Sequence, residues 1–366
     1  MTSRKKNIFI HGRPSGHPLH MKYGASVDAE FVFVDHILRW HDKGSGKTRK
    51  YTSWLLSSAF LPRKRSYSLI ISEGPHFMVG MLRWLRLIRK KQKLIALLDN
   101  ETLYFIDSGY YKKRTKNALV RLIKKYDGII SAGKMEADLA RKYAGPNAIV
   151  KQIFNGIEDK RLSKLLSIQP NTNSNNILFI GNIGAGWRSW YKGFDILLKS
   201  FEIAWQNNSL LHLQLIGLID STYLDELTRE FAPKSKVNID YIGYTSELDK
   251  YLTQSSLYLH PARGEAWGIS VTEAMAAGIM PLVSNLTGSQ EAVAKVDPDY
   301  IVELDENKIA AKILSHFGKE TIAKNQLAEK CKIIAEFYSE TNAIRAFSEA
   351  IAEMEVEFTK KQTGNT

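Results

Sequence analysis

Two glutamates separated by seven residues, Glu265 and Glu273, are the first candidates for chemistry in this sequence. They lie in the stretch RGEAWGISVTEAMAAG, residues 263–278. A carboxylate pair can work as acid and base, or each carboxylate can accept hydrogen bonds from sugar hydroxyls. Ser270 and Glu273 also fit the S-x-x-E capping box of a helix start, which would give Glu273 a structural role. The spacing alone leaves these alternatives open.

The neighbouring residues predict a strand, a loop and a helix around this pair. SLYLHPA (256–262) is typical of a buried strand, and residues 263–268 follow it as a loop. Residues 270–277 are typical of a helix that Gly278 ends. Ligands of parallel α/β sheets bind beyond the carboxyl ends of the strands. We therefore expect the loop and the helix start to cradle a phosphate or a sugar.

Strands and helices alternate along the whole chain, which predicts an α/β fold with parallel sheets. Strand-like runs occupy 7–12, 68–74, 93–99 and 127–133, and then 176–182, 211–218, 237–244, 256–262 and 280–285. The Asn-rich segment 169–176 separates the two series. We predict two doubly wound, Rossmann-like domains, residues 1–168 and 169–345, with an interdomain cleft.

Four segments resemble a known family. HPARGEAWGISVTEAMAAGIMPLVSNLTGSQEAV (260–293) is similar to the signature of retaining glycosyltransferases with the GT-B fold, in particular glycosyltransferase family 4 (glycosyl transferases group 1). FNGIE (154–158), YKGFDILLKSF (191–201) and IGYTSELDKYLTQSSLYLHPA (242–262) match other segments of that family in the same order. A single E-x7-E pair is a weak signal, whereas four ordered matches are specific.

The resemblance implies that a sugar passes from a nucleotide-sugar, a UDP- or GDP-sugar used as substrate, to an acceptor, without a cofactor. Glu273 would bind the donor ribose, and Glu265 would contact the donor sugar. Lys192 would neutralise the leaving diphosphate, because fixed positive charge stabilises an anion that develops in the transition state. In the same family the last helix, here from about residue 345, crosses back to the first domain. The donor-binding positions implied are Glu273, Gly268, Ile269, Trp267, Gly16 and Tyr244.

Two positions depart from the family. Asn182 stands where the family has an arginine directly after the strand glycine, and the longer loop that follows carries Arg188. Arg188 is our candidate for the missing cation; the alternative is a solvent-exposed loop arginine. Asp99 stands near the place of a family histidine. It is a candidate to orient or deprotonate an acceptor hydroxyl, or else it caps the following turn.

The segment HGRPSGH (11–17) follows the first strand and resembles the family loop that closes over the donor phosphates. Gly16 would allow the backbone to approach the phosphates closely. An ordinary strand-to-helix loop is the alternative. His11 and His17 have no metal-ligand spacing with each other or with a cysteine, so we predict no metal site.

The formal net charge of +13 is concentrated in the first half of the chain. Residues 1–170 hold 33 Lys and Arg against 13 Asp and Glu, a net charge of +20, and the remainder carries −7. Such asymmetry indicates an anionic partner. The basic side of the helical pattern 78–93 either faces anionic lipid or is simply solvated. We expect a lipid-linked or otherwise anionic acceptor.

Composition and hydropathy predict a cytoplasmic protein, and the basic first half would allow it to bind the inner face of the membrane peripherally. The chain has one cysteine, no apolar run long enough to span a bilayer and no secretory leader pattern. The sequence leaves three alternative functions: a catalytically idle scaffold, a nucleotide-sugar epimerase of the same fold, and a nucleic-acid-binding protein. The last is the least expected, since no recognition motif is present.

Overall fold

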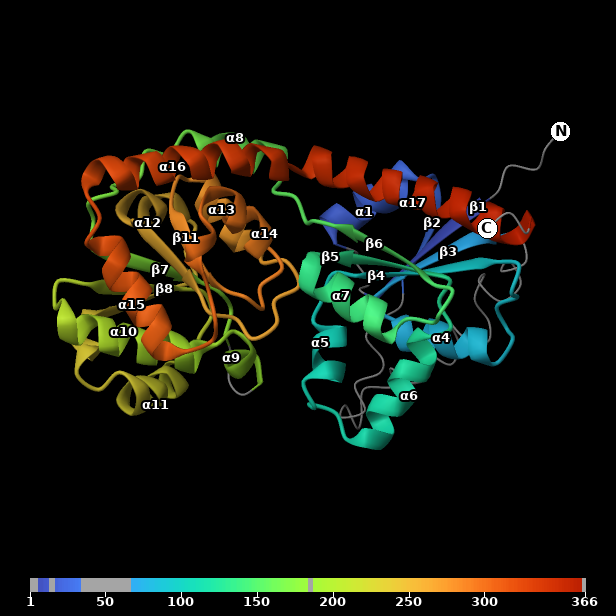
Figure 1. Cartoon of the computed structure of the whole chain (residues 1–366), viewed down its shortest axis with the longest axis horizontal. Helices are drawn as coiled ribbons and strands as arrows, with labels where there is room; N and C mark the ends of the chain where they lie inside the picture. The colour runs from blue at the N-terminus through green and yellow to red at the C-terminus, as the bar shows by residue number, and fades with distance from the viewer. Residues whose placement is uncertain (1–5, 13–16, 34–66, 184–186, 364–366) are drawn as a thin grey trace. The chain divides into compact units, whose positions relative to one another are not determined.

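The computed structural model describes residues 6–12, 17–33, 67–183 and 187–363. They form two compact units, Met1–Phe154 with Ala343–Thr366, and Asn155–Asn342 (Figure 1). We predicted the domain boundary after residue 168, whereas the two units divide after Phe154. Helix α8 (Asp159–Leu166) accounts for the difference, because it packs against α13 (Ile269–Ala276) of the second unit.

The first unit is built on a parallel sheet of six strands in the order β2-β1-β3-β4-β5-β6. Apolar runs such as KLIALL in β4 are buried on both faces, as expected for a parallel sheet. Its strands are β1 (Lys6–His11), β2 (Ala29–Phe33), β3 (Tyr67–Glu73), β4 (Lys93–Leu98), β5 (Gly128–Ala132) and β6 (Ile149–Ile153). Its helices are α1 (Pro18–Ser26), α4 (His76–Trp84), α5 (Thr102–Asp107), α6 (Lys113–Ile123), α7 (Lys134–Tyr143) and most of α17 (Glu340–Thr363).

Helices cover both faces of the first sheet (Figure 1). One face packs on α4, α5, α6 and α7 in a core that includes Ile8 and Leu94. On the other face, Tyr23 of α1 stacks on Phe347 of α17 with ring centroids 4.6 Å apart. The sulfur of Met354 also lies against Gly128 of β5. The last helix therefore packs on the first unit from residue 343 onward.

The second unit holds another parallel sheet of six strands, in the order β12-β11-β10-β7-β8-β9. Helices α12, α13, α14 and α16 lie on one face, and α10, α11 and α15 lie on the other (Figure 1). Its strands are β7 (Asn176–Ile180), β8 (His212–Ile216), β9 (Ile239–Gly243), β10 (Leu257–His260), β11 (Met280–Ser284) and β12 (Ile301–Val302). Its remaining helices are α9 (Trp187–Tyr191), α10 (Phe194–Asn207), α11 (Ser221–Phe231), α12 (Leu248–Gln254), α14 (Gln290–Val296), α15 (Glu306–Phe317) and α16 (Thr321–Ala335).

The predicted parallel α/β architecture is confirmed, and two local predictions need correction. The sequence patterns missed the strands β2, β6 and β12. The helical pattern predicted over 78–93 is wrong beyond Trp84, because Arg86 adopts a left-handed φ of 62° and the Leu87 N–H donates back to the Leu82 carbonyl. Glycine usually occupies this position of a helix end, so an arginine gave no stop signal. Across the described residues, no helix is long and apolar enough to cross a membrane.

Candidate functional site

In the second unit the strand order reverses between the neighbours β10 and β7. Such a reversal opens a crevice at the carboxyl ends of the two strands, where ligands of α/β folds bind. The chain runs from β10 into Glu265, and from β7 through α9 into Lys192. Two of the predicted site residues therefore meet at this edge of the sheet.

Lys192 and Glu265 form an ion pair between Nζ and Oε2. Their side chains are only 16% and 13% exposed. His260, the last residue of β10, is buried, and its Nε2 lies 3.5 Å from the same carboxylate oxygen. A lysine held in this way presents a fixed positive charge to an anionic ligand.

The surroundings of Glu265 keep its side chain ionised. Burial alone would raise the pKa of the Glu265 carboxyl, but the charge of Lys192 and the His260 imidazole hold that pKa well below its ordinary value. Burial lowers the pKa of His260, so its ring is neutral near pH 7. At neutral pH the site therefore contains one ammonium, one carboxylate and one neutral imidazole.

Two glycines allow the loops of the site to approach each other. A Cβ on Gly193, which has a φ of 68°, would lie 1.7 Å from the Pro261 carbonyl oxygen. A Cβ on Gly288 would lie 1.6 Å from the Ala266 carbonyl oxygen. The Gly288 N–H also donates to the Glu265 carbonyl at 2.8 Å. Only glycine fits at these contacts, which set the backbone on both sides of the ion pair.

Arg263 fastens α9 to the loop after β10. Its guanidinium makes two hydrogen bonds of 2.7 Å to the Asp195 carboxylate and lies over the ring of Trp190. The Tyr191 hydroxyl donates to the Gly264 carbonyl at 3.0 Å. This bidentate pair links the loop after β10 to the first turn of α10, just after Lys192, so the position of Lys192 is fixed by contacts outside the ion pair itself.

Glu273 lies in α13 and interacts with α8. Its Oε1 accepts a hydrogen bond from Arg161 Nε at 3.3 Å, and Arg161 Nη1 also contacts Asp249 at 2.5 Å. Burial raises the pKa of the Glu273 carboxyl, and the opposing charge of Arg161 offsets only part of this effect. The ligand-free protein therefore stabilises the charge of Glu273 less well than that of Glu265.

The predicted capping box is wrong. Helix α13 begins at Ile269, and Gly268 occupies the N-cap with a left-handed φ of 81° and no side-chain cap. The Ser270 hydroxyl accepts instead from the Tyr258 hydroxyl at 2.8 Å. Glu273 therefore does not belong to a capping box, and its carboxylate contacts Arg161.

The other predicted donor-binding positions have different environments. Trp267 is buried and its ring packs on Tyr338 with centroids 5.4 Å apart, so the ring is part of the core. Tyr244 follows β9 and is 80% exposed. Ile269 is the first residue of α13. Gly16 lies outside the described residues.

Arg188 and Asn182 occupy the places where the sequence departs from the family pattern. Arg188 lies in α9 with an exposed side chain, and its carbonyl accepts the Lys192 N–H at 3.0 Å. Asn182 is exposed, and its Oδ1 accepts from the Leu218 N–H at 2.9 Å. Asn182 therefore joins the loops after β7 and β8.

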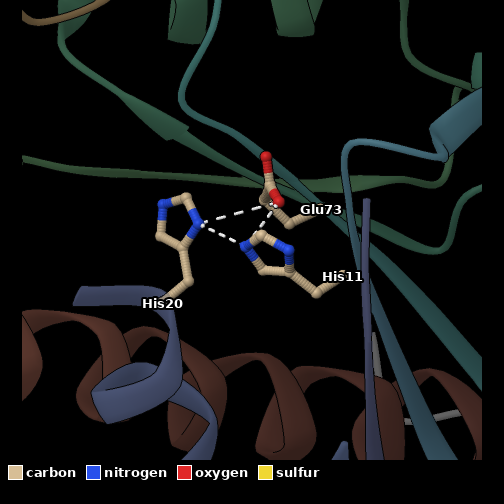
Figure 2. Close-up of side chains that lie close together, drawn as sticks. All are labelled: His11, His20 and Glu73. Carbon is tan, nitrogen blue, oxygen red and sulfur yellow. Dashed lines mark hydrogen bonds and ion pairs between the residues drawn. The ribbon is translucent and has the colours of Figure 1, made fainter. Parts of the chain in front are cut away.

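In the first unit the strand order reverses between β1 and β3. His11 and Glu73 end these strands as register partners, and His11 Nε2 lies 3.0 Å from Glu73 Oε2 (Figure 2). His20 of α1 points its Nδ1 to the same oxygen at 3.7 Å and its Nε2 to Asp99 at 2.7 Å. Asp99 is therefore bound to His20, while Asn100 accepts from the Thr102 N–H and caps the following turn.

Opposite charges dominate the protonation of this cluster. Burial alone would lower the pKa of His20, but Asp99 and Glu73 raise it to about 10. Burial alone would raise the pKa of Glu73, but hydrogen bonds from His11 and His20 hold it well below its ordinary value. Without a bound ligand, the cluster is an imidazolium between two carboxylates.

A second feature of the first unit is a cavity of about 960 Å³ with basic walls. It is lined by segments that directly precede β4, β5 and β6, so it lies at the amino ends of these strands. The exposed ring of Trp84 and the exposed side chain of Leu85 lie at or next to it. Its cationic lining includes Arg86, Arg89, Lys90, Lys124 and Lys125.

The sequence patterns missed five residues of these sites: Arg161, Asp249, His260, His20 and Glu73. Four of them lay within or near segments that the sequence patterns singled out. Asp249 and His260 lie within 242–262, Glu73 lies within the predicted strand 68–74, and Arg161 follows the turn FNGIE by three residues. Their partners lie far away along the chain, as with Arg161 and Glu273, so no local spacing connects them.

Comparison with known proteins gives one family and several relatives. Residues 166–334 match the family described as Glycosyl transferases group 1. An uncharacterized 41.2 kDa protein in the cps region of Klebsiella pneumoniae is 25% identical over 251 residues, 66% of this chain and 66% of that protein. An uncharacterized glycosyltransferase of Haemophilus influenzae is 25% identical over 252 residues, 67% and 68% of the two chains. The chain thus spans about two thirds of these relatives.

Two solved structures have a similar fold. HepE of Anabaena, in complex with UDP and glucose, has a TM-score of 0.66 at 15% identity, over 96% of this chain and 100% of that one. WaaG, a glycosyltransferase involved in lipopolysaccharide biosynthesis, has a TM-score of 0.64 at 15% identity, over 94% and 99%. At this identity the likeness establishes the two-sheet fold alone.

Proposed function

We propose that this chain, a GT-B protein of the glycosyl transferases group 1 through its residues 166–334, transfers a sugar from a nucleotide-sugar to an acceptor with retention at the anomeric carbon. The observation that carries the proposal is the buried pair of Lys192 and Glu265 at the reversal of the second sheet. Glu273 lies eight positions further along the same loop and helix, with a carboxylate that the protein stabilises poorly.

The proposed donor lies along the loop from residue 265 to Glu273. The Glu265 carboxylate accepts from sugar hydroxyls, and Glu273 accepts from the ribose diol, since a carboxylate has two acceptor oxygens. Lys192 faces the diphosphate. As the bond between the sugar and phosphate breaks, negative charge builds up on the leaving oxygens, and a fixed ammonium stabilises it. Arg188, on the exposed side of α9, is a second candidate cation.

In this proposal the positive charge at the diphosphate comes from side chains and backbone amides, and no metal ion is needed there. The leaving phosphate can take the proton of the acceptor hydroxyl. Asp99 belongs to the first unit and is the candidate for orienting that hydroxyl. Its bond to His20 keeps the Asp99 carboxylate in one position.

The most direct test is a thermal-shift screen with UDP, GDP, ADP and their sugars. A ligand that binds only the folded protein raises its melting temperature, by an amount that corresponds to about 2.7 kcal/mol at a hundredfold excess over Kd. We expect one nucleotide to stabilise the wild type and to lose its effect on Glu273→Ala. Glu329→Ala, an exposed glutamate on α16, is the matched control. If none of these nucleotides stabilises the wild type, the proposed donor site is wrong.

The reaction product separates transfer from its two alternatives. A transferase joins the sugar to an acceptor, an epimerase of the same fold releases free sugar, and an idle scaffold consumes no donor. We expect glycoside formation, and accumulation of free sugar alone would favour the epimerase. Binding of DNA or RNA with a steep dependence on salt would favour the nucleic-acid alternative.

We propose a lipid-linked or otherwise anionic acceptor in cell-envelope glycan synthesis. The support is the cps region of one relative and the lipopolysaccharide role of WaaG, together with the charge of the first unit. The basic cavity adds an anionic membrane surface as partner, at the cytoplasmic face. Trp84 and Leu85 supply exposed apolar side chains beside Arg86 and Arg89, the combination that binds the interface of an anionic bilayer.

Liposome sedimentation tests the membrane proposal. Each basic residue near an anionic surface contributes about 1 kcal/mol, so the triple variant Arg86→Glu, Arg89→Glu, Lys90→Glu should lose binding to phosphatidylglycerol vesicles by well over 100-fold. The variant Lys234→Glu, Lys236→Glu, Lys330→Glu makes the same charge change on the second unit and should keep most of the binding. Equal binding by both variants contradicts the proposed surface.

A further inference from the structure

The geometry points to a site for one divalent transition-metal ion, of the Zn²⁺ class, formed by His11, His20 and Glu73 in the first unit. Each residue offers one ligand atom, and the three atoms lie within 4.8 Å of one another (Figure 2). The site does not depend on the proposed transferase function. It departs from the expectation of no metal site, which was based on the spacing of His11 and His17 relative to each other and to a cysteine.

The spacing of the ligand atoms matches the coordination shell of zinc. His11 Nε2 lies 3.0 Å from Glu73 Oε2 and 3.1 Å from His20 Nδ1, and the third separation is 3.7 Å. Zn–N and Zn–O bonds of about 2.0–2.1 Å at tetrahedral angles place neighbouring ligand atoms about 3.3 Å apart. The three atoms therefore already have the separation that one ion would impose.

The fold holds these ligands without the ion. His11 and Glu73 are register partners at the ends of β1 and β3, so the sheet itself fixes them side by side. His20 comes from α1, and its ring stacks near Tyr23 with a centroid distance of 6.0 Å. His11 and His20 are almost fully buried, and the Glu73 side chain is 10% exposed. A preformed, buried set of this kind needs little reorganisation to bind a metal.

Asp99 supplies the outer contact expected of a metal site. It lies 2.7 Å from Nε2 of His20, the nitrogen that does not face the proposed ion. Metal-binding histidines usually donate this second N–H to a carboxylate, which fixes the tautomer and the ring orientation. Metal binding would release the Nδ1 proton of the His20 imidazolium. With Nε2 still donating to Asp99, the Nδ1 lone pair would then face His11 and Glu73, where the ion would replace the lost positive charge.

Two histidines and one glutamate form the ligand set of zinc sites that keep a fourth position open. The same set is also used for Fe²⁺, whereas Mg²⁺ and Ca²⁺ prefer oxygen ligands alone. The fourth position would take water or an oxygen of another ligand. The ion would join β1, α1 and β3 at the carboxyl edge of the first sheet.

The test is metal binding by the full-length, untagged chain after chelator treatment. We expect one equivalent of Zn²⁺ by mass spectrometry, competition against a chromophoric chelator, and visible absorption from four- or five-coordinate Co²⁺. Mg²⁺ should not compete. His11→Gln and Glu73→Gln should each lose the stoichiometric ion, and Asp99→Asn should weaken binding about 10- to 100-fold. His212→Gln, a histidine of the second unit, is the matched control and should bind like the wild type.

Circular dichroism and the melting temperature show whether each variant folds. If His11→Gln does not fold, Asp99→Asn and the Co²⁺ spectrum of the wild type still decide the question, because neither needs a ligand to be removed. Stoichiometric Zn²⁺ in the wild type and His212→Gln, with loss in Glu73→Gln, supports the site. Zn²⁺ binding by Glu73→Gln equal to that of the wild type overturns it, as does a wild type that takes up no Zn²⁺ or Co²⁺.

Discussion

The strand order reverses once in each sheet, and both reversals hold buried charged side chains. In the second sheet the cluster centres on the ammonium of Lys192, held by Glu265 and His260. In the first sheet it centres on His11, His20 and Glu73, with the His20 imidazolium held between Glu73 and Asp99. The lysine of the second sheet suits an anionic ligand, whereas the first cluster suits the proposed metal ion once the His20 proton has left. The two reversals thus share a buried cation held by carboxylates and differ in the ligand that we propose for each.

Glu265 and Glu273, the two glutamates of the second site, differ in how well the protein stabilises their negative charge. Glu265 has a lysine that keeps its pKa low, whereas burial raises the pKa of Glu273. The protein itself stabilises the charge of Glu265, so this carboxylate has a structural part beside the role in donor binding that we propose for it. The charge of Glu273 is costly in the empty protein, which is typical of a residue kept for a ligand.

Lys192→Met should have the largest effect. Removing one preorganised group that stabilises transition-state charge lowers the rate about 10²- to 10³-fold, so we expect sugar transfer to fall by this amount. Steady-state kinetics with the donor found in the nucleotide screen provides the measurement. Zn²⁺ content should not change, because Lys192 belongs to the other reversal. Lys330→Met, on an exposed face of α16, is the control, and equal losses in both variants would contradict the role of Lys192.

Glu265→Gln should have the largest effect on stability. It leaves the Lys192 ammonium mostly buried without a carboxylate, and breaking such a pair costs about 3 kcal/mol. Urea unfolding of the ligand-free chain provides the measurement. Glu303→Gln breaks the exposed pair with Lys308 and should leave stability unchanged. A Glu265→Gln variant as stable as the wild type would show that Glu265 does not balance the buried lysine.

Sequence alone predicted the parts of this molecule that depend on local pattern. Buried strands such as β4 and β10 were found because apolar runs end in recognisable turns, and Lys192, Glu265 and Glu273 were found because they lie in motifs. Contacts between distant segments were not predictable. The link from His20 to Asp99 and the one from Arg161 to Glu273 each join separate elements.

The failed capping box shows the same limit at short range. Ser270 and Glu273 have the right spacing, but Gly268 is the N-cap residue of α13. The Ser270 hydroxyl accepts a hydrogen bond from the Tyr258 hydroxyl instead. A tertiary hydrogen bond from β10 therefore decided what a local motif left open. At Arg86 a structural feature formed without a sequence motif. A helix end with a left-handed residue usually has glycine, so an arginine at this position gave no signal in the sequence.

The smallest expected effect is the dependence of nucleotide binding on pH, which separates Glu273 from Glu265. Only the ionised carboxylate accepts both hydrogen bonds of a ribose diol. Burial raises the pKa of Glu273, so binding should be complete above this raised pKa and weaken as the pH falls through it, at a higher pH than for an ordinary glutamate. Glu265, with its lowered pKa, stays ionised over the same range.

Calorimetric titration of the bound nucleotide from neutral to mildly acidic pH measures this effect. Glu273→Gln should bind weakly, by about 1.5–3 kcal/mol for the lost charged hydrogen bonds, and should lose the pH dependence. Its ligand-free form should be no less stable than the wild type at neutral pH. The sign follows from linkage: a carboxyl whose folded pKa is raised destabilises the folded state once it ionises, and glutamine removes that charge. If Glu273→Gln keeps the wild-type pH profile, another group causes the pH dependence. Glu273 would then interact with Arg161 and not with the nucleotide.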